Sequence, residues 1–145
     1  MSVCASIYEY RHVAGLFRKD RWVPMQLRAE GLALREHVPG GRILTIAPII
    51  ALEGGFRIYP QFATGSFAWR TAPYLSPDDR KKFGFVTESE LPALLASLPP
   101  AGILLGYDKK RETELLSYAE ENHFRRIKLP DKKTLWVPAP AKPGP

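Results

Sequence analysis

The sequence predicts an α/β domain, with a small, mainly parallel sheet flanked by helices and a C-terminal antiparallel hairpin. Three observations support this fold class. Short apolar segments bounded by glycine or proline alternate with segments of helical periodicity. The chain has 145 residues, of which 45% are hydrophobic and 25% charged, as in an ordinary single globular domain. Near the end, two apolar runs flank one short turn, which is typical of a hairpin.

The first half of the chain is predicted to contain helices and strands up to residue 59. Pro24 suits the first turn of a helix, and Pro39 with two glycines ends it. One face of this helix carries apolar or small residues at helical spacing: Leu27, Gly31, Leu34 and Val38. The next three segments are interpreted as a strand, a short helix and a strand: 42–47, 48–52 and 56–59. Residues 61–74 show no period, so we expect them to lie outside regular structure.

The second half begins with two helices that have recognisable starts. Ser76 followed by Pro77 and two acids predicts a short helix that closes by Gly84. Ser89 is the predicted cap of the next helix, which places Pro92 in the first turn. The remaining segments are interpreted as a buried strand, an amphipathic helix and the two strands of the hairpin: 102–106, 110–122, 124–129 and 133–137.

The chain is divided into three parts by composition. Residues 1–22 form an N-terminal arm, residues 23–137 the α/β domain, and residues 138–145 a proline-rich tail expected to be flexible. The arm mixes aromatic rings with basic side chains, a combination that suits a membrane–water interface. An arm that packs on the domain explains the same composition, and both alternatives stay open.

Charge and metal-ligand content limit the possible partners. Twenty-one basic and fifteen acidic residues give a net charge of +6. This balance is compatible with an anionic partner or with plain surface charge. The single cysteine, Cys4, excludes an internal disulfide and a cysteine-based zinc site, and the three histidines lack metal-ligand spacing. No apolar run approaches the length of a membrane span, so the chain itself is expected to be soluble, with no metal and no cofactor.

No group of residues predicts catalysis. The glycine pairs do not follow a strand and open a helix, as a phosphate loop requires. Ser66 lacks the second glycine of a nucleophile elbow, and the paired carboxylates at 78–79 and 120–121 fit a helix start and a solvated helix face. The basic residues of the terminal hairpin fit the protection of an edge strand, so we expect no nucleic-acid partner.

The segment 53–70 is the candidate ligand-binding region. Glu53, Tyr59, Trp69 and Arg70 lie close together in sequence and outside predicted regular structure, where they would form a cleft. The alternative is structural: the aromatic rings fill a small core, and Glu53 forms an ion pair with Arg70.

The same region resembles a known family. The resemblance rests on five segments: ILTIAP at 43–48, LEGG at 52–55, IYP at 58–60, TGSFAWR at 64–70 and PPAGILLGY at 99–107. They resemble the soluble C-terminal region of bacterial polytopic glycosyltransferases related to protein mannosyltransferase and lipid A aminoarabinose transferase. The resemblance covers roughly residues 20–137.

The resemblance implies an accessory domain on the extracytoplasmic (periplasmic) face of the bacterial inner membrane. In that family a transmembrane portion precedes this domain and transfers a sugar from a polyprenyl-phosphate carrier, with its catalytic acids in the membrane part. The implied partners are therefore that transmembrane portion, an anionic membrane surface and a glycan or lipid-linked sugar, with no catalytic residue in this chain. From the residues alone, two alternatives stay open: a free-standing module that binds an anionic or sugar ligand through 53–70, and an interaction domain without a ligand.

Overall fold

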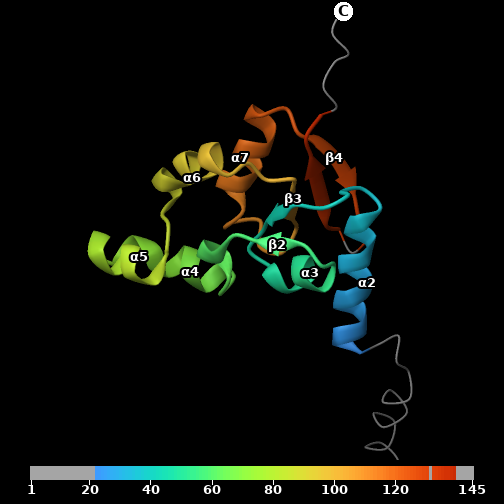
Figure 1. The fold of residues 1–145 in the computed structure, drawn as a ribbon, viewed down its shortest axis with the longest axis horizontal. Coiled ribbons are helices and arrows are strands. Elements are labelled where there is room, and N and C mark those ends of the chain that lie inside the picture. Colours follow the sequence, from blue (N-terminus) through green and yellow to red (C-terminus); the bar gives the residue numbers. More distant parts are fainter. Residues whose placement is uncertain (1–21, 131, 140–145) are drawn as a thin grey trace, which may run out of the picture.

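The computed structural model describes residues 22–130 and 132–139, which form six α-helices and a five-stranded sheet (Figure 1). The helices are α2 (Val23–Arg35), α3 (Pro48–Glu53), α4 (Ser66–Thr71), α5 (Pro77–Phe83), α6 (Leu91–Ser97) and α7 (Thr113–Glu121). The strands are β1 (Arg42–Leu44), β2 (Arg57–Ile58), β3 (Gly102–Leu105), β4 (Arg125–Lys128) and β5 (Thr134–Val137). The α/β fold class is confirmed. The predicted arm at 1–22 lies outside the described residues except for Trp22, as does the end of the tail at 140–145.

The sheet is mixed rather than mainly parallel, with strand order β2-β1-β3-β5-β4. β1 pairs in parallel with β2 and β3, whereas β5 pairs antiparallel with both β3 and β4. The hairpin was expected to add one antiparallel edge. The second strand of the hairpin, β5, also lies against β3 and runs antiparallel to it. Two of the four strand pairings are therefore antiparallel.

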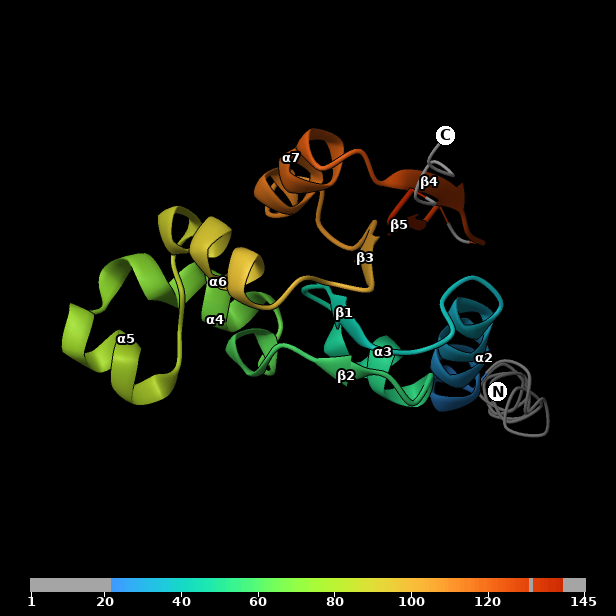
Figure 2. The same cartoon turned by 45° about the horizontal axis from the view of Figure 1, so that its top comes forward.

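Helices cover both faces of the sheet, with α2 and α3 on one side and α4, α6 and α7 on the other (Figure 2). Alternation along the strands produces this division, since successive side chains point to opposite faces. In β3, Ile103 and Leu105 pack under α6 and α7, whereas Leu104 packs under α2. In β1, Leu44 and Ile43 divide in the same way.

The segment 61–74, expected outside regular structure, is largely helical. It holds α4, a 3-10 turn before it at Pro60–Phe62 and another after it at Ala72–Tyr74. The absent periodicity has a physical reason: a six-residue helix shows less than two turns of pattern. Its stability comes from tertiary packing, because the rings of Phe62 and Trp69 lie 5.3 Å apart in the core.

The start of α6 differs from the prediction at its cap. A 3-10 turn at Glu88–Glu90 precedes the helix, and the capping interaction involves Thr87 instead of Ser89. The backbone N–H of Thr87 donates to Glu90 Oε2 at 2.8 Å. The Ser76 cap of α5 is confirmed, because its Oγ accepts the Asp79 N–H and the helix ends at left-handed Gly84.

None of the helices in residues 22–130 and 132–139 is both long and apolar enough to cross a membrane.

Candidate functional site

The two aromatic members of the predicted cleft are buried in the core. Tyr59 is 1% exposed and its hydroxyl donates to the Leu98 carbonyl at 2.6 Å, which ties the end of β2 to the end of α6. Burial raises the pKa of Tyr59, and the nearby positive charge of Arg42 only partly opposes this effect. Trp69 is 6% exposed and packs in the core cluster with Phe62. Both rings therefore have a structural role.

The two charged members are accessible to solvent but do not meet. Glu53 ends α3, and its carboxylate lies 4.0 Å from Arg28 Nη1 of α2. Arg70 is exposed on α4, and among the described residues no ion pair joins it to Glu53. The predicted Glu53–Arg70 pair is thus replaced by a pair between α2 and α3. Ligand contact by Glu53 or Arg70 stays a prediction.

Packing between α2 and α3 accounts for the glycines beside Glu53. A β-carbon on Gly54 would lie 2.4 Å from the Gly31 carbonyl oxygen. Gly55 has a φ of 72°, and a β-carbon there would lie 2.3 Å from the Arg35 guanidinium. Arg35 Nε in turn donates to the Gly54 carbonyl at 2.5 Å. The motif at 52–55 therefore fits a close helix contact, with no ligand needed to explain it.

Exposed apolar side chains gather on α2, α3 and α4. Of the eleven large hydrophobic residues with substantial exposure among the described residues, seven belong to these helices or the residue before α2, and we call them the apolar face. They are Trp22, Val23, Met25, Leu32, Ile49, Leu52 and Phe67. Single exposed hydrophobic residues are ordinary, whereas a group of them indicates an interaction surface.

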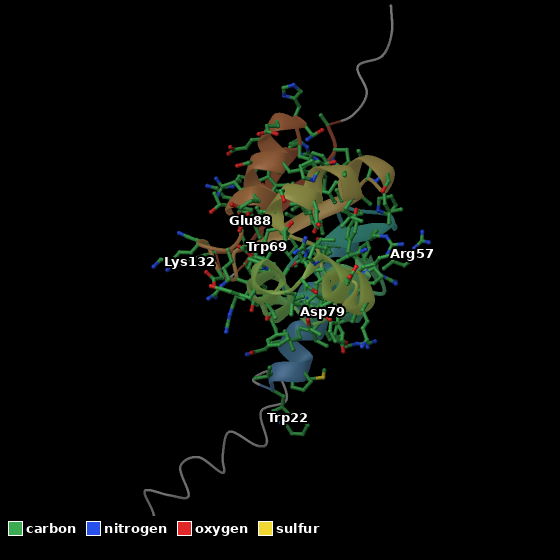
Figure 3. The ribbon with its side chains drawn as sticks, turned by 90° about the vertical axis from the view of Figure 1, so that its left-hand side faces the viewer. Trp22, Arg57, Trp69, Asp79, Glu88 and Lys132 are labelled. Atoms are coloured by element: carbon green, nitrogen blue, oxygen red, sulfur yellow. The ribbon has the colours of Figure 1, made fainter. Side chains whose placement is uncertain are left out.

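Contacts between neighbouring helices bring parts of the apolar face close together. Met25 and Leu32 share a side of α2 with Arg28, which reaches Glu53 on α3. Ile49 and Leu52 are three residues apart on α3, on the side that the sheet does not cover. The three helices lie along the lower side of the molecule in Figure 1, where the described chain begins, and Figure 3 shows Trp22 projecting there.

The starts of α3 and α4 are close together. Gly65 precedes α4, and a β-carbon on it would lie 2.9 Å from the Ile46 carbonyl and 3.6 Å from Pro48 Cδ. Phe67, two residues after Gly65, is 57% exposed. The sequence assigned 48–52 to a short helix within an apolar run, and the exposure of Ile49 and Leu52 was not foreseen. The spacing of three residues between Ile49 and Leu52 is the sequence pattern that indicates an apolar, solvent-facing side of this helix.

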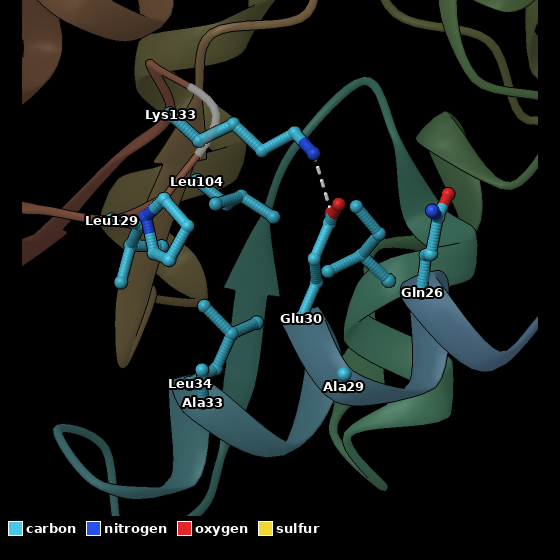
Figure 4. Close-up of a pocket in the computed structure, with 10 residues that line it drawn as sticks. Gln26, Ala29, Glu30, Ala33, Leu34, Leu104, Leu129 and Lys133 are labelled. Carbon is cyan, nitrogen blue, oxygen red and sulfur yellow. Dashed lines mark ion pairs between the residues drawn. The ribbon is translucent and has the colours of Figure 1, made fainter. Parts of the chain in front are cut away.

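A hollow of about 520 Å³ lies on the side of the sheet that α2 and α3 cover, between α2 and the turn of the hairpin (Figure 4). Its lining is mostly apolar, with Leu34, Leu104 and Leu129 among its walls. The ion pair of Glu30 with Lys133 Nζ, 2.5 Å long, joins α2 to the hairpin here.

The environment of Lys133 favours its charged form. Burial by itself lowers the pKa of Lys133, but its hydrogen bond with Glu30 and the electrostatic influence of Tyr107 and Glu30 outweigh burial and raise it. The ammonium also lies 5.2 Å from the centre of the Tyr107 ring. Because its charge is matched in this way, the pair fastens α2 to the hairpin and closes one side of the hollow.

Two acids near the end of β3, Glu112 and Asp108, also have local partners. Glu112 is only 4% exposed. Its two carboxylate oxygens accept hydrogen bonds from the backbone N–H groups of Gly106, at 2.8 Å, and Tyr107, at 3.1 Å. Asp108 pairs with Arg111. These contacts shape the loop after β3, and within the described residues no group of three or more His, Cys, Asp or Glu side chains is arranged to hold a metal ion.

The chain matches no protein-family model, no curated protein and no solved structure.

Proposed function

We propose that this chain is an accessory extracytoplasmic domain of a membrane glycosyltransferase that uses a polyprenyl-phosphate-linked sugar donor. In this proposal the domain does not catalyse the transfer. It lies on the periplasmic face of the inner membrane and packs with its apolar face against the transmembrane portion of the enzyme and the adjoining lipid.

The apolar face is the observation that carries the proposal. It adjoins the start of α2, where a preceding membrane portion would connect to the domain. Arg28 and Arg70 flank its apolar side chains, and long basic side chains beside apolar groups suit the boundary between lipid and water. The resemblance of residues 20–137 to the family's soluble region gives independent support for the same placement.

Four acidic side chains of the fold make structural contacts. Glu112 holds backbone amides, Glu53 and Glu30 pair with bases, and Glu90 caps a helical turn. A general acid or nucleophile needs a position beside a reacting group and a pKa suited to its task. Carboxylates committed to structural contacts fit a domain that positions or covers an acceptor.

The membrane contact is tested with matched variants of the chain. Trp22→Ser, Ile49→Ser and Phe67→Ser together remove much of the apolar face. Tyr74→Ser with Phe83→Ser removes exposed aromatic rings that lie outside it. We expect co-sedimentation with vesicles that contain anionic lipid to fall strongly for the first variant and to stay unchanged for the second. Equal binding by both variants and the unaltered chain contradicts the proposal.

The parent enzyme is tested at the level of the gene. We expect the reading frame to continue upstream of Met1 through several apolar segments of membrane-spanning length. A stop codon and a ribosome-binding site directly before Met1 would refute this part of the proposal. The purified chain, mixed with a lipid-linked sugar and acceptor, is expected to give no transfer.

A further inference from the structure

A second hollow, of about 600 Å³, lies on the opposite face of the sheet from the first, between α7 and the β4–β5 hairpin. We call it the basic hollow. The volume is within the range of sites that hold small molecules. Its floor includes Trp136 of β5, and its borders are α7, the outer strand β4, and the loops after β3 and before β5.

The register of the hairpin directs basic side chains into this hollow. Arg126 is paired with Trp136 and Lys128 with Thr134, so these four side chains project from the same face. Ile127, between the two bases, packs in the opposite core cluster. The sequence pattern was interpreted as protection of an edge strand, but the structure shows two of its bases lining a hollow with an aromatic floor.

The free polar groups of the basic hollow are mainly donors. Five basic side chains line it against two acidic ones, and one of the five, Lys133, is paired with Glu30. The other four have no ion pair within the described residues: Lys109, Arg126, Lys128 and Lys132. Of the acids, Glu112 already accepts two backbone N–H groups, which leaves Glu120 on the outer part of α7.

Trp136 adds an unused donor. Its Nε1 atom is buried and has no hydrogen-bond acceptor among the described residues. A buried N–H without an acceptor is unusual, since nearly all such groups are paired with protein or water. A ligand with several acceptor oxygens would satisfy it together with the four free cations.

Two backbone segments meet at the border of the basic hollow. A β-carbon on Gly106, which has a φ of 117°, would lie 2.8 Å from Lys133 Cα, so the loop after β3 and the hairpin turn are in direct contact. Glu112, the residue before α7, binds the backbone of the same loop. Contacts of this kind reduce the ordering of the backbone that binding would require.

We infer that the basic hollow binds a phosphate-bearing ligand, with the phosphate oxygens on Arg126, Lys128 and the neighbouring lysines and a ring or chain of the ligand over Trp136. Arginine recognises phosphate through two parallel N–H donors, and lysine adds charge on a flexible stem. The inference rests on the hairpin register and the free cations, and it stands independently of the proposed function.

The test uses the indole N–H signal of Trp136, identified in the NMR spectrum through Trp136→Phe. The probes are pyrophosphate, a hexose 1-phosphate, and vesicles of phosphatidylcholine with or without phosphatidylglycerol. We expect a saturable shift of this signal with at least one phosphate probe. Arg126→Gln with Lys128→Gln should weaken binding about tenfold or more, because charge-assisted contacts are lost.

Arg125→Gln is the matched control, because Arg125 precedes Arg126 on the same strand and borders a shallow hollow on the other side of the sheet. Binding by this variant should stay within about twofold of the unaltered chain, because the Arg125 side chain projects from the opposite face of the strand and its charge is screened by solvent. Melting curves of all variants check that the fold is intact.

The probes distinguish the source of the phosphate. Saturable binding of the soluble phosphates supports a soluble ligand. Binding that needs phosphatidylglycerol vesicles and is lost in the Arg126→Gln, Lys128→Gln variant supports a lipid headgroup. The inference is overturned if no probe shifts the Trp136 signal, or if the double variant and the Arg125→Gln control bind equally. Tighter binding of single-stranded RNA that depends equally on Arg125 also overturns it.

Discussion

The backbones of Gly31 and Gly54 touch where α2 packs against α3. A β-carbon on Gly31 would lie 2.4 Å from the Gly54 amide nitrogen and 2.5 Å from the Ile50 carbonyl oxygen. No side chain separates the two helices at this point, so the apolar face, which spans both helices, depends on this contact for its shape.

Gly31→Ala should therefore destabilise the protein. Both obstructing groups are backbone atoms and cannot rotate away, so the helices must separate, at a cost of about 3 kcal/mol in the free energy of unfolding. Gly40→Ala is the control, since a β-carbon there has no atom within 4 Å. Alanine also lowers the conformational entropy of the unfolded chain, which favours the folded state. Urea denaturation measures both. Equal stability of the two variants would show that α2 is not packed as described.

Tyr59→Phe is expected to lower stability by about 1 kcal/mol, because the buried Tyr59 side chain loses its partly buried hydrogen bond to the Leu98 carbonyl. Tyr74→Phe, which removes a hydroxyl from a residue that is 88% exposed, should change nothing measurable. Thermal and urea unfolding compare the two. If Tyr59→Phe leaves stability intact, the hydroxyl becomes available for the ligand contact that the sequence suggested.

Arg70→Ala should leave the free energy of unfolding within about 0.5 kcal/mol of the unaltered chain, because Arg70 is exposed and unpaired among the described residues. Glu53 pairs with Arg28, and their side chains are 35% and 61% exposed, so the coupling in a double-mutant cycle should not exceed about 1 kcal/mol. A cycle of Glu53 with Arg70 should show no coupling. If Arg70→Ala destabilises the protein and Glu53→Gln recovers that loss, the ion pair between Glu53 and Arg70 predicted from the sequence is present after all.

Acidification should remove the stabilising effect of Glu90. The hydrogen bond from the Thr87 backbone N–H is the main reason that its pKa lies below the ordinary value of 4.5; burial opposes this, and Thr87 Oγ1 and Arg80 lower the pKa further. A carboxyl with a lowered folded-state pKa stabilises the fold above 4.5 and loses that effect as the pH falls through the folded-state value. Glu90→Gln should thus be less stable than the unaltered chain at neutral pH and equally stable in strong acid. Glu88→Gln, in the same turn, controls for charge alone; a pH-independent difference for Glu90→Gln would contradict the expectation.

The sequence was sufficient for most elements because local signals agreed with the final packing. The apolar face of the first helix, the buried strand at 102–105 and the terminal hairpin all combine a clear period with clear stops. The Thr87 cap was also predictable from the sequence, since a threonine three residues before a glutamate is the capping-box pattern. Preference for Ser89 came from fitting Pro92 into the first turn, which the preceding 3-10 turn accommodates in another way.

The rest depended on contacts between distant segments. Helix α4 has no side-chain cap and too few residues for a period, and it is held by the packing of Trp69 on Phe62. The position of Glu53 is decided by a helix that begins thirty residues earlier. In the basic hollow, Arg126 and Lys128 gain their relation to Trp136 only through the register of β4 on β5. Such pairings cannot be read from spacing along the chain.

The place of β5 in the sheet has a consequence for biosynthesis. It is the last strand along the described chain, yet it lies inside the sheet and joins β3 to β4. It also supplies Leu135 and Val137 to the cluster under α2. A nascent chain that has emerged only as far as Leu129 therefore exposes an unpaired edge of β3 and an incomplete core. The domain can complete its fold only after translation has passed Val137, and until then that edge is open to chaperones or to misassociation with other chains.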